Sequence, residues 1–431
     1  MQKNRTDLDT LHYVPQPIIS HRSLCRTYER HGKRLKLYFV FVIIIGIIII
    51  AYMPCLQKKI KGTLKMPFSL LIKPAGPDCN LNCKYCFYSI KDCLFGQGPH
   101  RMSNAILEKM TCDYLKLGLG VSSFAWQGGE PTLMGLDFYK KAVELQKQYG
   151  RDGQIVSNAF QTNGILLDDG WCKFLNEYKF LVGISLDGPK KYHDYYRLDH
   201  SGKGTFDKVM AAIEKCRKHE VEFNVLVLLN DKNVIDPDGL FDFFVSQNIK
   251  FLQFIPCVEN DPKTGKITSF SITPEQCGNF IIRIFNLWKN YGPDKLSIRL
   301  FDSMMHYILK QKHTDCTFGW LCDDYIVMEH NGDAYCCDFF VEPEYKLGNI
   351  METPIEKLLS SNVKKDFAER KKQLSNKCFV CGHSPICRGG CLKDRLVSNH
   401  NFSDSSYFCQ SYKLIFDKIL PELTWILSTR F

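Results

Sequence analysis

Short apolar segments alternate with longer segments of helical periodicity from residue 66 onward. The apolar runs that fit strands are 68–72, 122–126, 155–160, 181–186, 223–228 and 251–256. Between them, stretches such as 104–117 and 138–148 repeat apolar residues three and four positions apart, as helices do. Six successive strand-then-helix units predict an α/β fold with a parallel, partly closed barrel.

This alternation ends near residue 292, where cysteines, glycines and short loops become frequent. We therefore expect a barrel over residues 66–291 and a second, cysteine-rich domain over residues 292–431. These 366 residues carry 44 basic and 43 acidic side chains. So balanced a charge gives no reason to expect a basic face for nucleic acid.

Residues 1–65 differ from the rest in composition. They hold 12 Lys or Arg against three Asp or Glu, and include an uncharged apolar run over residues 37–52. The run is short for a membrane-spanning helix, which needs ~20 apolar residues, and no small-residue cleavage site follows it as in a signal peptide. Two interpretations stay open: a membrane anchor, or an untranslated extension with synthesis starting at Met66. In either case we expect a cytoplasmic catalytic body.

The chain has 20 cysteines, and many of them are clustered. A chain of this length can build its own core without disulfides, so clustered cysteines indicate metal in a reducing compartment. Cys79, Cys83 and Cys86 form one cluster directly after the first predicted strand. Three thiolates can hold a four-iron cluster and leave one iron open to a further ligand. The alternative is a zinc site, but zinc often takes a histidine as fourth ligand, and none lies inside this loop.

Nine more cysteines lie in the second region, and eight of them match the number that two fully ligated four-iron clusters require. These eight are Cys316, Cys322, Cys337, Cys378, Cys381, Cys387, Cys391 and Cys409. A zinc ribbon built from four of them is the alternative, but it leaves the other four unexplained. Cys336 directly precedes Cys337 and could take its place. The remaining cysteines of the body stand singly and are expected to be core thiols.

The sequence GPDCNLNCKYCFY around the first cluster resembles the signature of the radical S-adenosylmethionine superfamily. In that family the amino and carboxylate groups of the cofactor bind the open iron. The segment Gly128-Gly129-Glu130-Pro131 is similar to the family's GGEP element, whose backbone and carboxylate receive the cofactor's amino group. The same resemblance makes Ser185 and Arg197 cofactor contacts, and a hydroxyl and a guanidinium suit a ribose and a carboxylate.

The eight later cysteines resemble the twin-cluster SPASM domain, in which the ligands interleave. The resemblance implies one cluster on Cys316, Cys322, Cys337 and Cys391, which we call the near set. It implies a second on Cys378, Cys381, Cys387 and Cys409, the far set. Three [4Fe–4S] clusters would then be present. Two clusters without an open iron suit the uptake of an electron, which favours a two-electron oxidation.

Within the superfamily, the closest resemblance is to the anaerobic sulfatase-maturating enzymes, from about Met66 to the C-terminus. It rests on MPFSLLIKPAGPDCNLNCKYCFY, FAWQGGEPTL, FQTNGILL, ISLDGP, QFIPCVE and YCCDFF. These enzymes oxidise a cysteine or serine of a sulfatase, within Cys/Ser-x-Pro-x-Arg, to Cα-formylglycine. The resemblance implies Asp338 as catalytic base, a low-potential electron donor such as ferredoxin or flavodoxin, and S-adenosylmethionine held by Tyr85, Gly129, Ser185, Arg197 and Val258.

Other functions stay open at this point. Another SPASM peptide maturase, for example one that makes thioether crosslinks, would share these motifs, although residues 1–65 do not resemble the winged-helix domain such enzymes often carry. A non-catalytic iron–sulfur electron-transfer protein would keep the clusters but would not cleave the cofactor. The sequence does not distinguish a cysteine target from a serine target.

Overall fold

One mixed sheet of ten strands organises the molecule. The computed structural model describes residues 68–399 and 401–430. The strand order is β10-β9-β8-β1-β2-β3-β4-β5-β6-β7. The strands are β1 Ser69–Lys73, β2 Val121–Trp126, β3 Ile155–Thr162, β4 Leu181–Ser185, β5 Phe223–Leu229, β6 Phe251–Pro256, β7 Ser297–Ile298, β8 Tyr325–Glu329, β9 Asp333–Tyr335 and β10 Lys346–Asn349.

Strands β1 to β6 are parallel and neighbour one another in chain order. Each lies within two residues of the strand that the apolar runs predict. The sheet does not close, because β10 and β7 each pair with one strand only. The predicted α/β fold with a partial barrel is therefore confirmed.

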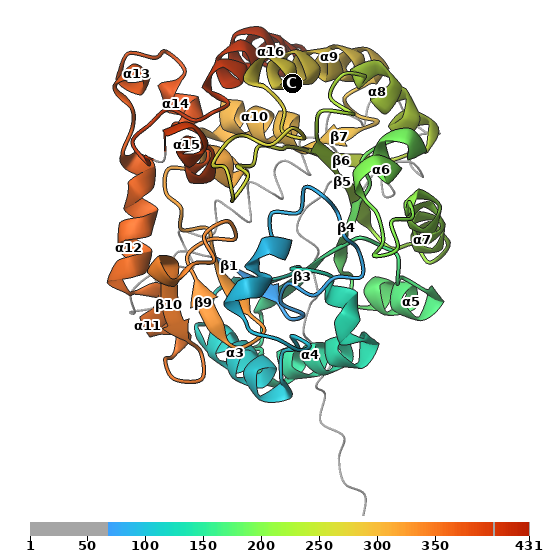
Figure 1. Cartoon of the computed structure of the whole chain (residues 1–431), viewed down its shortest axis with the longest axis vertical. Helices are drawn as coiled ribbons and strands as arrows, with labels where there is room; N and C mark the ends of the chain where they lie inside the picture. Colours follow the sequence, from blue (N-terminus) through green and yellow to red (C-terminus); the bar gives the residue numbers. More distant parts are fainter. Residues whose placement is uncertain (1–67, 400, 431) are drawn as a thin grey trace, which may run out of the picture.

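The long helices of the barrel are α3 Asn104–Lys116, α4 Leu136–Tyr149, α5 Asp169–Glu177, α7 Phe206–Lys218, α8 Pro237–Ser246 and α9 Pro274–Tyr291, with the short α6 Lys190–Tyr196 after β4. They form an arc around the strands (Figure 1). Polar caps fix where they begin: Thr273 and Gln276 form a reciprocal capping box at the start of α9. Facing side chains such as Leu70, Phe124 and Trp126 are buried in the main core between sheet and helices.

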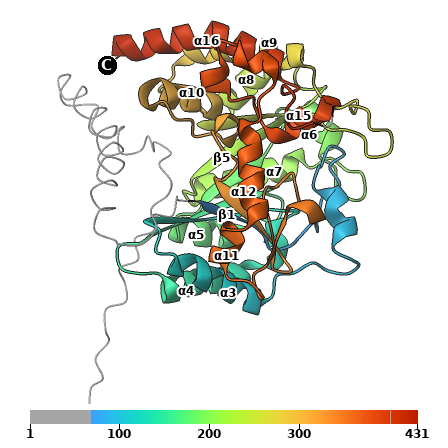
Figure 2. The ribbon, with the colours of Figure 1, turned by 90° about the vertical axis from the view of Figure 1, so that its left-hand side faces the viewer.

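The cysteine-rich region adds α10 Arg299–Lys310, α11 Ile355–Leu359, α12 Asn362–Glu369, α13 Asn376–Phe379, α14 Ser384–Cys387, α15 Leu392–Asn399 and α16 Cys409–Arg430. Helix α16 lies beside α9 in both views (Figures 1 and 2). Leu414 of α16 closely approaches Gly278 of α9.

Strands β8 to β10 extend the barrel sheet at its β1 edge. Strand β8 pairs in parallel with β1, which places Lys73 beside Glu329, and β9 returns antiparallel to β8. The apolar runs did not predict this continuation of the sheet. It brings the segment around Cys337 to the ends of the first barrel strands. The domain boundaries at residues 65/66 and 291/292 stay predictions.

The apolar run over residues 37–52 lies outside the described residues. Within residues 68–399 and 401–430, no helix combines the length and apolar character needed to cross a membrane.

Candidate functional site

The loop carrying Cys79, Cys83 and Cys86 follows β1, as expected from the sequence. The 196–200 segment holds it: the Asn82 amide donates to the Leu198 carbonyl (2.8 Å) and the Lys84 amide to the Tyr196 carbonyl (3.3 Å). Burial raises the pKa of the Cys79 thiol to about 12, with smaller contributions from Glu130, Cys83 and Cys86. The charges of the Cys83 and Cys86 thiolates thus act on Cys79. The role of the three thiols as ligands stays a prediction.

The Gly128-Gly129-Glu130 segment lies directly against this loop. The Gly129 amide donates to the Gly76 carbonyl and the Glu130 amide to the Asp78 carbonyl, both at 2.8 Å. A Cβ on Gly129 would overlap the Asp78 carbonyl oxygen, and Gly128 has a φ of 121°. Both positions therefore require glycine, for the close approach and for the left-handed backbone respectively.

The Glu130 carboxylate is completely buried and accepts four hydrogen bonds. Its donors are the Thr132 amide (3.0 Å), the Thr132 hydroxyl (2.6 Å), the Thr162 hydroxyl (2.8 Å) and the Asn163 amide (2.8 Å). Burial raises its pKa. The carboxylate thus ties the end of β2 to the end of β3 beneath the Cys79 thiol. Its predicted contact with the cofactor's amino group stays a prediction.

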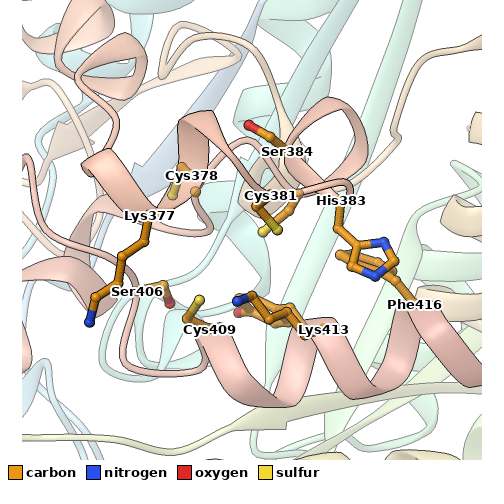
Figure 3. A pocket seen from close by; sticks show the side chains of 12 residues that line it. Lys377, Cys378, Cys381, His383, Ser384, Ser406, Cys409, Lys413 and Phe416 are labelled. Carbon is orange, nitrogen blue, oxygen red and sulfur yellow. The ribbon is translucent and has the colours of Figure 1, made fainter.

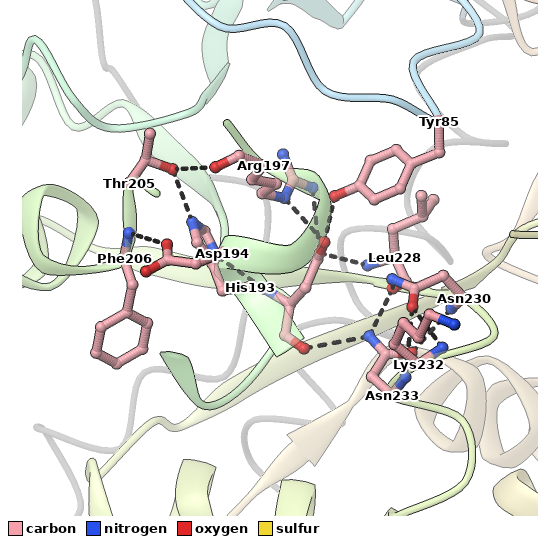
Figure 4. A network of polar contacts seen from close by, with 11 residues as sticks. Tyr85, His193, Asp194, Arg197, Thr205, Phe206, Leu228, Asn230, Lys232 and Asn233 are labelled. Carbon is pink, nitrogen blue, oxygen red and sulfur yellow. Dashed lines mark hydrogen bonds and ion pairs between the residues drawn. The ribbon is translucent and has the colours of Figure 1, made fainter. Parts of the chain in front are cut away.

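Tyr85 and Arg197, two predicted cofactor contacts, meet at a carboxylate that sequence reasoning missed. The Tyr85 hydroxyl donates to Asp187, and Arg197 reaches the same carboxylate through Nε (3.1 Å) and Nη2 (3.2 Å). The Arg197 guanidinium also lies 5.5 Å from the centre of the Tyr85 ring and lowers the pKa of the Cys83 thiol, which burial raises to about 12. The fully buried Asp187 therefore fixes both side chains. Figure 4 shows Tyr85 and Arg197 close to each other in this network.

Ser185 ends β4, and its side chain is almost fully buried. Val258 follows β6 and lies in the main core, with its carbonyl oxygen accepting a hydrogen bond from Lys393 of α15. Both therefore lie at carboxyl ends of parallel strands, where α/β folds bind their ligands. Their contacts with the cofactor stay predictions. Asp187, two residues after Ser185 in ISLDGP, could have been noted as an acidic residue at the same strand end.

Asp338, the predicted base, contacts two residues at the ends of β1 and β2. Lys73 forms an ion pair with one carboxylate oxygen, and the Gln127 amide nitrogen donates to the other (3.0 Å). The Asp338 side chain is 15% exposed and that of Lys73 only 1%. Neither partner was predicted from the sequence. The features that could have indicated them are a lysine at the end of an apolar run and a glutamine directly before the two glycines.

A second buried acid lies beside this pair. Glu329, paired with Lys73 across the sheet, accepts hydrogen bonds from the Tyr88 hydroxyl at 2.7 and 2.8 Å. The Lys73 ammonium lies 3.4 Å from the centre of the Tyr88 ring. Burial raises the pKa of Glu329 to about 7, although Lys73 opposes the shift.

The thiols of the near set lie within range of one another's charges, and their grouping as the ligands of one cluster stays a prediction. Burial raises the pKa of Cys316 well above its usual value, with further contributions from Cys391 and Cys337, and Cys322 contributes to the raised pKa of Cys337, which is about 11. The Tyr325 hydroxyl lies 3.2 Å from the Cys337 sulfur. The neighbouring Cys336 packs with Phe340, Phe367 and Leu392, and Cys337 packs against the same cluster. Cys337 rather than Cys336 as the ligand stays a prediction.

The far set lines one pocket (Figure 3). Cys378, Cys381, Cys387 and Cys409 come from α13, the following turn, α14 and the start of α16. The sulfur atoms of Cys381 and Cys409 point into the same space, and Lys377 and Lys413 also line the pocket. Cys391, which a zinc ribbon would include, does not line this pocket, whereas Cys409 does.

Three buried cations lie close to the thiols of the later cysteine sets. Lys364, Lys371 and Arg395 are all at least 96% buried. Their hydrogen bonds go to backbone carbonyls, and in the described part of the chain none of them forms an ion pair with a carboxylate. A buried cation without a counter-charge is costly. Four-iron clusters held by four thiolates carry net negative charge and would supply that counter-charge.

Known proteins match this arrangement. A model of the Radical SAM superfamily matches residues 74–244, and a model of the SPASM iron-sulfur cluster-binding domain matches residues 316–382. A serine-type anaerobic sulfatase-maturating enzyme of Bacteroides thetaiotaomicron is 37% identical over 85% of this chain and 94% of its own. The chain belongs to the anaerobic sulfatase-maturating enzymes. It is therefore a radical S-adenosylmethionine enzyme of the SPASM subgroup.

Relatives of both target types are about equally similar. A cysteine-type anaerobic sulfatase-maturating enzyme of Clostridium perfringens is 38% identical over 83% of this chain and 97% of its own. The solved structure of native anSMEcpe with bound AdoMet and Cp18Cys peptide has a TM-score of 0.78 at 35% identity, covering 84% of this chain and 100% of that one. Overall similarity within the sulfatase-maturating family therefore does not distinguish a cysteine target from a serine target.

Proposed function

We propose that this enzyme oxidises a cysteine or serine of a sulfatase, within a Cys/Ser-x-Pro-x-Arg sequence, to Cα-formylglycine. The observation that carries the proposal is the position of the Asp338 carboxylate. Lys73 and Gln127 hold it at the ends of β1 and β2, and β1 leads into the loop with Cys79, Cys83 and Cys86. A base is thus fixed beside the loop expected to hold the cofactor. Peptide binding by the related solved structure supports a peptide substrate.

The three thiol sets would hold three [4Fe–4S] clusters, and S-adenosylmethionine would bind at the first. When bound, the cofactor and the first cluster would supply a 5′-deoxyadenosyl radical that takes a hydrogen atom, and the two auxiliary clusters would accept an electron. Asp187 orients Arg197 and Tyr85 toward the first cluster. Gly128 and Gly129 let their segment approach the loop backbone.

Asp338 takes the proton in this scheme. A cysteine side chain loses a hydrogen atom from Cβ, a proton from the thiol and one electron, which leaves a carbon–sulfur double bond. Water then replaces the sulfur, sulfide leaves, and an aldehyde remains. The carboxylate oxygen held by Gln127 is a suitable proton acceptor, because the other oxygen is engaged by Lys73.

A protein electron carrier such as ferredoxin or flavodoxin is proposed to exchange electrons with the enzyme. The surface at the far set supports this partner. Phe379 and Val380, between two cysteines of that set, are 72% and 88% exposed. Lys377 and Lys413 line the pocket formed by the same set. Small apolar patches with a charged rim suit transient protein partners. Because oxidisable clusters require a reducing environment, we propose that the catalytic body lies in the cytoplasm.

The decisive experiment uses the full chain with its clusters reconstituted anaerobically. A peptide containing Cys-x-Pro-x-Arg is incubated with the enzyme, S-adenosylmethionine and dithionite. We expect 5′-deoxyadenosine, and a peptide that has the mass of the aldehyde and reacts with a hydrazide probe. A matched peptide with alanine in place of cysteine should stay unmodified.

The same experiment separates the alternatives. If 5′-deoxyadenosine forms and the cysteine peptide loses only hydrogen without gaining an aldehyde, a crosslinking maturase is the better description. If no 5′-deoxyadenosine forms although the clusters are intact, the chain lacks radical activity and both descriptions fail. A serine peptide tested in parallel determines which residue the enzyme prefers.

A further inference from the structure

The segment Arg388-Gly389-Gly390 connects the far set to the near set. It joins Cys387 of the far set to Cys391 of the near set, and all three of its residues have left-handed backbone angles, with φ values of 51°, 75° and 68°. Left-handed residues normally occur singly, so three in succession need a specific cause. A Cβ on Gly389 would overlap the guanidinium of Arg395.

Two buried cations donate hydrogen bonds to the carbonyl groups of this segment. Arg395 donates to the Arg388 carbonyl (2.9 Å) and the Gly389 carbonyl (3.0 Å), and Lys371 donates to the Gly390 carbonyl. The three carbonyl groups between the two sets are therefore all bound by cations. The left-handed backbone turns them toward Arg395 and Lys371.

The two cations are joined to each other and to both thiol sets. Arg395 also donates to the Lys371 carbonyl (3.1 Å), and Lys371 donates to the carbonyl of Thr317 (2.7 Å), next to Cys316 of the near set. Arg395 is fully buried and Lys371 is 1% exposed. Through their hydrogen bonds, Lys371 contacts the residues next to Cys316 and Cys391 of the near set, and Arg395 contacts the two residues that follow Cys387 of the far set.

The titratable groups that act on Arg395 are mainly cysteine thiols of the two sets. Asp394 is the acidic group whose pKa responds to Lys371, but it forms no ion pair with Lys371 or Arg395 among the described residues. Lys364 differs from the pair, because within residues 68–399 and 401–430 its ammonium donates hydrogen bonds only to the Cys322, Tyr325 and Cys336 carbonyls of the near region. The structure thus holds two cations shared by both sets and one cation restricted to the near set.

We propose that Lys371 and Arg395 form a shared cationic bridge that raises the reduction potentials of both auxiliary clusters together. The proposal rests on the proposed function, in which two four-iron clusters occupy the near and far sets. Each reduced cluster carries one more negative charge than the oxidised form, so a buried cation between the two stabilises the reduced form of both. Net charge and hydrogen bonding around the cluster are established controls of iron–sulfur potentials.

The test is a redox titration of the two auxiliary clusters, followed by electron paramagnetic resonance. The full chain with Cys79, Cys83 and Cys86 replaced by alanine serves as background, so that the first cluster does not contribute. Lys371→Met and Lys371→Gln should make both midpoint potentials more negative, whereas Lys371→Arg should leave both close to the starting values. Lys364→Met should shift one potential, and Lys372→Met, at an exposed position, should shift neither.

A shift of only one potential, or of none, in Lys371→Gln with full auxiliary iron would overturn the proposal. If the neutral variants lose their iron but Lys371→Arg keeps it, the charge is required and the proposal holds. Loss of iron in Lys371→Arg as well assigns the residue a packing role and rejects the bridge. The potentials are independent of aldehyde formation. Shifted potentials in this background, together with no aldehyde product from the reconstituted wild-type chain, would keep the bridge and refute the proposed function.

Discussion

The ion pair between Lys73 and Asp338 joins the first strand of the barrel to the residue that follows Cys337. Lys73 ends β1 and is almost completely buried, while Asp338 belongs to the cysteine-rich region. This contact exists because β8 extends the barrel sheet beside β1. A carboxylate from the later region is thereby fixed near the loop that carries the first three thiols.

Asp338→Asn should separate cofactor cleavage from product formation. An amide cannot accept the thiol proton as a carboxylate does, so aldehyde formation should fall by roughly 100-fold or more, while 5′-deoxyadenosine still forms. The substitution also leaves the buried Lys73 ammonium without its partner, which should destabilise the fold by about 3 kcal/mol. Chromatography of 5′-deoxyadenosine, mass spectrometry of the peptide and urea denaturation measure these effects.

The double variant Lys73→Met/Asp338→Asn is the matched control for stability. It removes both charges, so it should be more stable than Asp338→Asn alone and equally poor in aldehyde formation. An Asp338→Asn enzyme with unchanged aldehyde yield would remove Asp338 from its role as base.

Replacing Cys79, Cys83 and Cys86 with alanine should leave about two-thirds of the iron, as expected for one four-iron cluster lost of three. The first loop is held by the 196–200 segment and by the Glu130 amide, which donates to the Asp78 carbonyl, and none of the later cysteines belongs to it. Iron and sulfide analysis of the anaerobically purified variant measures the loss. Complete loss of iron would mean that the sites are not independent, and full retention would mean that these cysteines hold no cluster.

The sequence predicted the parts of the site that depend on spacing. Cysteine spacing indicated a first group of three and a later group of eight, and the apolar runs predicted the six parallel strands. The interleaving of Cys391 and Cys409 was implied by the resemblance to the SPASM domain and stays a prediction. Lys371, Arg395 and Asp187 were not predicted. A single charged residue in a sequence is usually solvated, and nothing local shows that these three side chains are buried. The continuation of the sheet into β8 depends on a long-range pairing that periodicity does not reveal.

Gly129→Ala should weaken cofactor binding by roughly tenfold or more, because overpacking of this kind costs about 1–3 kcal/mol. The new methyl group would overlap the Asp78 carbonyl oxygen and push the segment away from the loop that carries Cys79. Calorimetric titration of the reconstituted enzyme with S-adenosylmethionine measures the effect. Gly120→Ala is the control, since its Cβ would meet no atom within 4 Å. Equal binding by both variants would contradict the close approach.

His193 should make the protein sensitive to acid. Its Nδ1 accepts a hydrogen bond from the Asp187 amide (3.3 Å), and its Nε2 contacts the Thr205 hydroxyl (3.0 Å), which in turn donates to the Arg197 carbonyl (2.8 Å). Nδ1 must therefore be unprotonated. Burial lowers the pKa of His193 to about 4 from its usual 6.5.

Between these two pKa values the unfolded chain binds more protons than the folded one, so stability falls as the pH falls. From about pH 7.5 to about pH 5 the loss due to His193 should be about 2 kcal/mol. Urea denaturation at both pH values measures it. His193→Gln should be less stable at neutral pH but should lose less stability on acidification than the wild type, whereas His306→Gln should follow the wild type. Cluster loss in acid affects all three proteins alike and cancels in the comparison. Parallel pH profiles for wild type and His193→Gln would show that the imidazole does not titrate in this range.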